Sequence, residues 1–160
     1  MENGPLEINY QQEIFAPIDV VFSYLKDDEK MKLWMEGLEK IEYPKGKNYD
    51  NPVGTEFIHT IKEGGHLQQY TGSVTEYTDP TLIAVELHNS AFQINVTYEL
   101  TAISRKTQLD YHCEMEFASF FHRIMGFLFC GFTNRILKSQ MKNLKLLAEQ
   151  EAVRRPTVED

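Results

Sequence analysis

The chain has 160 residues, 42% of them apolar, and 16 Lys and Arg against 24 Asp and Glu give it a formal net charge of −8. This length suits one domain with one hydrophobic core. The negative charge, with no basic stripe, argues against nucleic acid as a partner. The longest apolar stretch, residues 117–132, is interrupted by His122 and Arg123 and is shorter than the about 20 residues that cross a bilayer. No secretion signal is evident at the N-terminus, so a cytoplasmic protein is expected.

The hydrophobic pattern predicts one folded domain over residues 7–151, after an N-terminal extension (1–6) and before a flexible tail (152–160). Its helices and strands follow from apolar periodicity and from the turn residues between them. In chain order we expect a strand (7–15), two short helices (19–25 and 29–35), a strand (39–43), a loop (44–54), five strands (55–62, 67–77, 82–88, 92–102 and 107–117) and one long helix (119–151).

Short turns separate the last five strands, which predicts antiparallel neighbours. Directly paired residues of such strands share a face of the sheet, so the register can be carried from hairpin to hairpin. One face is then apolar and the other carries acids, amides and threonines, as expected of a face in water. The expected pairs are His59 with Tyr70, Val74 with Val85, Val85 with Ile94, and Tyr98 with Tyr111.

The long helix begins after Ser119, a candidate N-cap, and is long enough to cross the sheet. Its first half, residues 120–132, is apolar on nearly every side, which exceeds what one core-facing stripe requires. A wide pocket, a partner subunit or a membrane surface could take up this surplus, and the negative charge makes the membrane the least favoured. The simplest partner is a second copy, in a homodimer through residues 120–132. Gly126 and Gly131 predict a bend or a close approach in this half.

Several short segments at turns, caps and core positions resemble a known family. They are Ile14-Phe15-Ala16-Pro17, Val20-Val21-Phe22, Trp34 at the end of the second helix, Pro52-Val53-Gly54-Thr55, Gly72-Ser73-Val74-Thr75-Glu76-Tyr77 and Lys106-Thr107-Gln108-Leu109. With the order of the elements, they resemble the START/SRPBCC superfamily, and within it the polyketide cyclase/dehydrase branch. The resemblance implies an α+β helix-grip fold, in which a curved antiparallel seven-stranded sheet wraps around a long C-terminal helix, with two short helices after the first strand.

The resemblance also implies a cavity between sheet and helix. Members of the superfamily bind lipids, sterols, hormones or aromatic polyketides, and only some are enzymes, so the fold leaves the activity open. We expect Gly72 to face this cavity between Phe57 and Leu87, where a leucine would obstruct an open cavity with little strain. The residues expected to bind a ligand are Trp34, Phe57, His59, Tyr70, Val85, Leu87, Ile94, Tyr98, Tyr111, Ile124 and Leu128.

His59 and Tyr70 are the one place where an imidazole is expected beside a phenol in apolar surroundings. Such a pair suits either general acid/base catalysis or a structural hydrogen bond. The structural interpretation is preferred because no third group is expected to orient the imidazole. Tyr98 and Tyr111 either orient a ligand through their hydroxyls or pack as aromatic rings.

The preferred hypothesis is therefore a binder of a small hydrophobic or aromatic molecule, without catalysis. One alternative is an enzyme of the polyketide cyclase or dehydratase type, with His59 and Tyr70 as acid and base. Another is a co-chaperone-like domain that interacts with proteins. No spacing of His, Asp or Glu indicates a metal site, and no motif indicates a cofactor. Cys113 and Cys130 are expected to be free thiols.

Overall fold

The computed structural model describes residues 5–88, 90 and 92–155, with the side chains of 120–133 outside the described part. The elements in chain order are β1 (Leu6–Ile14), α1 (Ile18–Lys26), α2 (Asp28–Trp34), β2 (Leu38–Glu42), β3 (Glu56–Glu63), β4 (His66–Thr78), β5 (Leu82–His88), β6 (Phe92–Ile103), β7 (Lys106–Phe117) and α3 (Phe120–Arg154). The strands form one seven-stranded antiparallel sheet in the order β1-β7-β6-β5-β4-β3-β2. The helix-grip architecture is confirmed.

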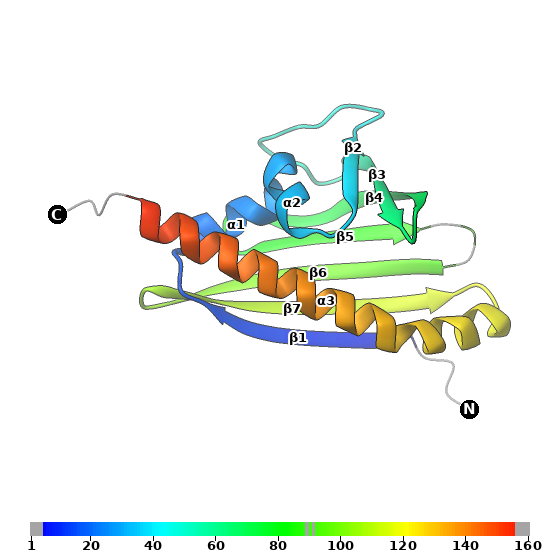
Figure 1. The fold of residues 1–160 in the computed structure, drawn as a ribbon. Helices are drawn as coiled ribbons and strands as arrows, with labels where there is room; N and C mark the ends of the chain where they lie inside the picture. The colour runs from blue at the N-terminus through cyan, green and yellow to red at the C-terminus, as the bar shows by residue number, and fades with distance from the viewer. Residues whose placement is uncertain (1–4, 89, 91, 156–160) are drawn as a thin grey trace.

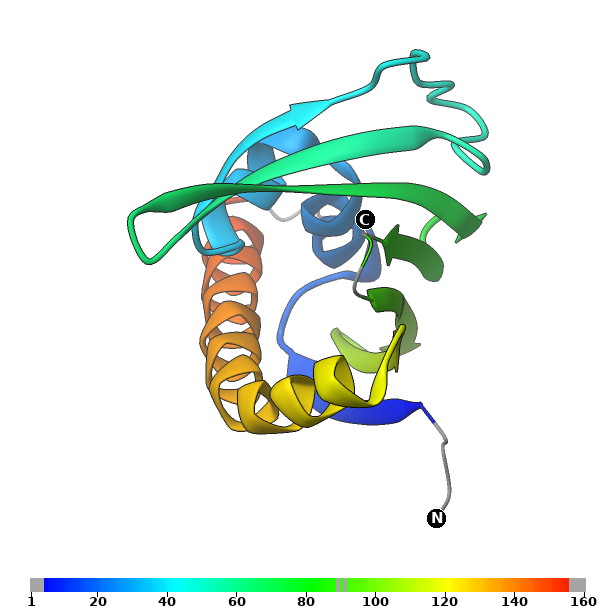
Figure 2. The same cartoon turned by 90° about the vertical axis from the view of Figure 1, so that its right-hand side faces the viewer.

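The long helix α3 lies across one face of the sheet, and α1 and α2 lie beside its C-terminal half (Figure 1). Seen from the side, the sheet curves around this helix (Figure 2). The first turns of α3, in yellow, run in a different direction from its orange and red turns, which agrees with the bend expected near Gly126 and Gly131.

The hydrophobic core lies where α1, the C-terminal half of α3 and strands β1, β7 and β6 meet. From α3 it takes residues spaced by three or four, Leu137, Met141, Leu144 and Ala148, the spacing that places them on one stripe of the helix. Trp34 ends α2 in this core, and its indole N–H donates a hydrogen bond of 2.8 Å to the carbonyl of Tyr24. Burying each large apolar side chain contributes about 1.5–3 kcal/mol, so this end of the domain is the more strongly stabilised.

The expected register is confirmed at three of its four pairs: His59 with Tyr70, Val74 with Val85, and Tyr98 with Tyr111. The fourth is wrong, since Val85 pairs with Val96 and Ile94 pairs with Leu87. The innermost pair of that hairpin is His88 with Gln93, so its turn is longer than the two-residue turn expected. A shift by two residues preserves the face of every side chain, and the apolar face therefore stays as expected.

Both ends of the domain extend further than expected. Leu6, placed in the N-terminal extension, begins β1 and pairs with Met115. The helix α3 continues to Arg154, and the Arg155 guanidinium donates to the Asp19 carboxylate of α1 at 2.9 Å. Residues 152–154, which were expected in the tail, therefore belong to α3.

Two further expectations concern the cysteines and the membrane. Cys113 is buried and forms no disulfide with any described residue, as expected, and the side chain of Cys130 lies outside the described residues. Within the described part of the chain, no helix combines the length and the apolarity that crossing a bilayer requires.

Candidate binding cavity

A cavity of about 1600 Å³ lies between the inner face of the sheet, α2, the segment 43–52 and the middle of α3. The inner-face side chains Ile83, Val85, Leu87 and Ile94 are only half-buried, although α3 lies across this face (Figure 1). In a filled core such side chains would pack at the density of an organic crystal. The sheet and the helix therefore enclose space that the described side chains do not fill.

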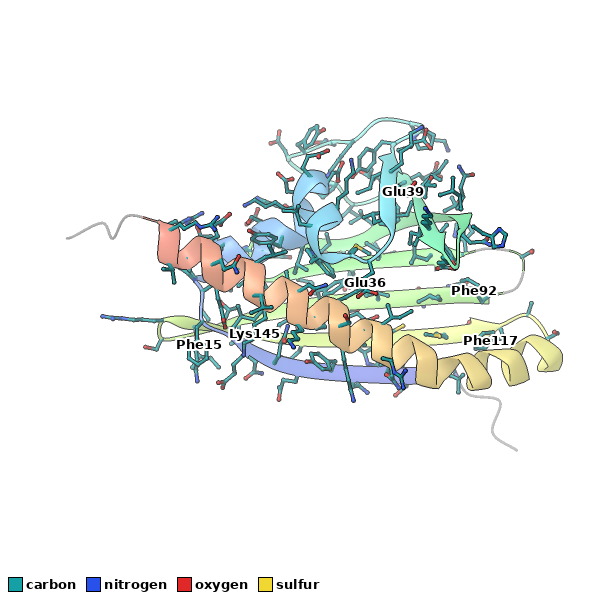
Figure 3. All side chains as sticks on the ribbon, viewed as in Figure 1. Phe15, Glu36, Glu39, Phe92, Phe117 and Lys145 are labelled. Atoms are coloured by element: carbon teal, nitrogen blue, oxygen red, sulfur yellow. The ribbon has the colours of Figure 1, made fainter. Side chains whose placement is uncertain are left out.

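The structure brings together every expected binding residue whose side chain it describes. Ile124 and Leu128 belong to the part of α3 whose side chains lie outside the described residues. The cavity is also lined by Phe92 and Phe117, which pair across β6 and β7 and are labelled in Figure 3. The expected residues on its wall are Trp34, Phe57, His59, Tyr70, Val85, Leu87, Ile94, Tyr98 and Tyr111.

His59 and Tyr70 are neighbours in register, but no hydrogen bond joins their side chains. The Tyr70 hydroxyl donates instead to the Glu63 carboxylate, 2.9 and 3.1 Å from its two oxygens. Burial, together with this carboxylate, raises the pKa of Tyr70 to about 12. The His59 ring packs against Phe57 with 4.6 Å between centroids. The expected structural hydrogen bond between the imidazole and the phenol is thus wrong, because the Tyr70 hydroxyl donates to the Glu63 carboxylate.

The His59 imidazole is neutral near pH 7. Burial lowers its pKa to about 4, and the negative charge of Asp28 only partly opposes that shift. No side chain among the described residues makes a hydrogen bond to this ring. His59 therefore offers the cavity a neutral ring that can both donate and accept a hydrogen bond.

Tyr98 is a half-buried residue of the cavity wall. Its ring meets Trp34 and Tyr111 edge-on, with centroids 6.4 and 5.2 Å apart. Burial raises the pKa of both phenols above their ordinary value, so both keep their proton. The Tyr111 hydroxyl has Cys113 as a hydrogen-bond partner, whereas the Tyr98 hydroxyl has none among the described residues. Because Tyr98 lies on the cavity wall, its hydroxyl is available to a ligand.

A polar cluster that the sequence did not predict lies at the cavity, built from α2 and the segment that follows β2. The Tyr43 hydroxyl donates to Asp28 Oδ1 at 2.6 Å. Lys47 Nζ lies 3.3 Å from the Tyr43 oxygen and 3.7 Å from the same carboxylate oxygen. Burial and the Asp28 carboxylate raise the pKa of Tyr43 far above its ordinary value. The charge of Lys47 is therefore already compensated by a protein carboxylate.

Tyr77 also lines the cavity, although the alternating pattern of β4 did not predict it on the inner face. A β-bulge between Val74 and Glu76 shifts the register of β4, so that Tyr77 turns inward and lines the cavity. Its ring packs on Phe22 with 5.6 Å between centroids. The sequence signal for this bulge was the spacing of three residues between the apolar Val74 and Tyr77. An extra residue in one strand reverses the alternation of faces, so both side chains can point inward.

Gly72 lies between Phe57 and Leu87, as the register predicted, but it is not open to the cavity. A Cβ atom there would meet the carbonyl oxygen of Glu86 and would lie 2.7 Å from Phe57 Cζ and 2.8 Å from Leu87 Cδ2. The expectation that a leucine fits here with little strain is therefore wrong. The Phe57 side chain covers Gly72, and the unfilled space lies elsewhere on this face.

Comparison with known proteins supports the same architecture. Among solved structures, an aromatase/cyclase (Zhui) from Streptomyces sp. R1128 is 14% identical with a TM-score of 0.72, covering 91% of this chain and 94% of its own. A START superfamily protein from Mycobacterium smegmatis is 14% identical with a TM-score of 0.68, covering 92% and 99%. A protein from Nitrosomonas europaea is 18% identical with a TM-score of 0.70, covering 91% and 96%. At these identities the likeness shows the fold alone.

No curated protein matches the chain. The sequence itself nevertheless matches a family, described as polyketide cyclase / dehydrase and lipid transport, over residues 5–149. That match spans all seven strands and most of α3. The chain therefore belongs to the polyketide cyclase/dehydrase and lipid transport family.

Proposed function

We propose that this protein binds a small, uncharged hydrophobic or aromatic molecule in the cavity between the sheet and α3, without transforming it. The observation that carries the proposal is the cavity of about 1600 Å³ that the described side chains leave unfilled, in which Val85, Leu87 and Ile94 stay half-buried beneath a helix. Ligand sites in proteins commonly measure about 300–1,000 Å³ and are mostly apolar. A cavity of this size suits a multi-ring or long-chain molecule.

The charges around the cavity favour an uncharged ligand. Two of the three lysines on its wall are paired, Lys26 with Asp79 at 2.7 Å and Lys47 with Asp28 at 3.7 Å. Carboxylates outnumber these lysines, so a ligand anion would lose its hydration and meet net negative charge. The carboxylates on the wall are Asp27, Asp28, Glu29, Glu36, Asp50, Glu63 and Asp79.

The unpartnered polar groups favour a ligand that carries an oxygen. The Tyr98 hydroxyl can donate to a ligand carbonyl or hydroxyl, and His59 can accept from a hydroxyl or donate to a carbonyl. The rings of Trp34 and Tyr111 beside Tyr98 provide faces and edges on which an aromatic ring can pack. A neutral aromatic or alicyclic molecule with a hydroxyl or carbonyl group satisfies these features together.

Native mass spectrometry of the freshly purified protein, with displacement of a neutral fluorescent dye, tests the proposal. Val85→Trp places a large ring in the cavity and should abolish dye binding while the melting temperature stays close to that of the wild type. Glu86→Gln, on the other face of the same strand, is the control and should bind the dye normally. Tyr98→Phe should weaken binding of a hydroxyl- or carbonyl-bearing ligand by about twofold to tenfold, the value of one hydrogen bond.

Two results would contradict the proposal. If Val85→Trp unfolds the protein while the wild type binds no dye, the space is filled by protein and there is no site. If an anionic dye of the same shape binds as tightly as the neutral one, the charge argument fails even though a cavity exists.

A further inference from the structure

The outer face of the sheet, opposite the cavity, brings three potential metal ligands together from β1 and β7. Glu7 pairs directly with Glu114, and Asn9 pairs with His112. One nitrogen of His112 and one carboxylate oxygen each of Glu7 and Glu114 lie within 4.8 Å of one another. Zinc binds imidazole nitrogen and carboxylate oxygen at about 2.0–2.2 Å, so one ion can contact all three atoms after small rotations of the side chains.

The hydrogen bonds of His112 orient it as a ligand. Its Nδ1 lies 2.5 Å from the amide oxygen of Asn9, and its Nε2 lies 3.1 Å from Glu114 Oε1. An amide oxygen only accepts, so the contact with Asn9 has Nδ1 as its donor. Nε2 is then the nitrogen that faces Glu114, where its lone pair can bind a cation.

The charges around the three residues favour a cation. No Lys or Arg among the described residues forms an ion pair with Glu7 or Glu114. Like charges directly opposite each other on neighbouring strands are destabilising, and Asp110 and Glu116 add negative charge on the same strand. A divalent cation would offset the charge of both carboxylates.

We propose that Glu7, His112 and Glu114 form a binding site for a divalent transition-metal ion of the zinc type, with Asn9 as the residue that positions the imidazole. One nitrogen and two carboxylate oxygens suit such an ion, with water in the remaining position. The ligands join β1, at the edge of the sheet, to β7. The ion would stabilise the pairing of β1 with β7 from the outer face of the sheet, which does not line the cavity.

Isothermal titration calorimetry with zinc chloride, on the full chain without an affinity tag, tests the site. The wild type should bind one zinc ion saturably, and zinc should raise its melting temperature, because an ion that binds only the folded state stabilises it. His112→Gln and Glu114→Gln should each weaken binding by more than about tenfold. Asn9→Ala should weaken it by about tenfold, as expected when the partner of a metal-bound histidine is lost.

Two matched variants control for charge and for imidazole elsewhere. Glu99→Gln removes an acid from the outer face of the neighbouring strand, and His66→Gln removes an exposed histidine, and both should bind zinc as the wild type does. Absence of saturable binding would overturn the proposal and assign His112 to a structural ion pair. Equal zinc affinity in wild type, His112→Gln and Glu114→Gln would also overturn it, because zinc would then bind elsewhere.

Discussion

Acidification should destabilise this protein through His59, by an amount that follows from the burial of its imidazole. Burial lowers the pKa of His59 from 6.5 to about 4. Above pH 6.5 the ring is neutral in both folded and unfolded protein and adds no pH dependence. As the pH falls from 6.5 towards 4, the unfolded chain takes up a proton that the folded protein excludes, so the free energy of unfolding falls. At 1.36 kcal/mol per pH unit, the loss is about 2.5 kcal/mol at pH 4.5, about 3 kcal/mol at pH 4, and approaches about 3.4 kcal/mol at lower pH.

Urea unfolding followed by circular dichroism at about pH 7, 5.5 and 4.5 measures this loss. His59→Gln removes the titrating group, so the stability of the wild type relative to this variant should decline by about 2.5 kcal/mol between the highest and lowest pH. The carboxylates titrate in both proteins and largely cancel in that difference. His66→Gln, at an exposed position, should keep the wild-type slope. Parallel profiles for wild type and His59→Gln would refute the reasoning, because the imidazole would then be hydrated in the folded state.

Three further predictions concern packing, a spectroscopic reporter and assembly. Gly72→Ala should lower the free energy of unfolding by about 1–3 kcal/mol, since the Glu86 carbonyl cannot move aside as a side chain can; an unchanged urea midpoint would contradict this. Trp34, the only tryptophan, lines the cavity, so its fluorescence should change when a neutral aromatic ligand binds, and a constant emission at saturating ligand would place the ligand elsewhere. Sedimentation at increasing concentration should show the homodimer predicted through residues 120–132, and a monomer throughout would remove that prediction.

Except after the β-bulge that turns Tyr77 inward, the face that a strand residue presents could be predicted from the sequence, because it depends on alternation and on the parity of the turns. Tyr98 and Tyr111 line the cavity as expected, while Glu114, three residues after Tyr111, lies on the outer face. The predicted pairing of Val85 with Ile94 is wrong, but both residues line the cavity, as that pairing predicted. An error of two residues in a turn changes the partners in a sheet without changing its faces.

Hydrogen-bond partners could not be predicted in the same way, because they depend on side chains that distant elements bring together. Tyr70 is a cross-strand neighbour of His59 but donates to Glu63, nearer the turn of the same hairpin. Asp28 on α2 meets Tyr43 beyond β2, a contact that needs the path of the chain between them. The outer-face cluster of Glu7, His112 and Glu114 was missed for the same reason, since β1 and β7 lie far apart in the sequence.

The enzyme alternative has His59 and Tyr70 move protons on a bound substrate, and in the structure the Tyr70 hydroxyl donates to Glu63. A base with a pKa of about 4 is weak at neutral pH, and no described side chain orients its ring for transfer. We therefore expect His59→Gln to bind the neutral dye as the wild type does, and we expect neither protein to accelerate cyclisation or dehydration of a model β-keto thioester above the uncatalysed rate. A measurable rate that rises with an apparent pKa near 4 and disappears in His59→Gln would establish catalysis and overturn the proposal of binding without reaction. A rate that persists in His59→Gln would also overturn it, and would place the chemistry at Tyr98 or in the Asp28–Tyr43–Lys47 cluster.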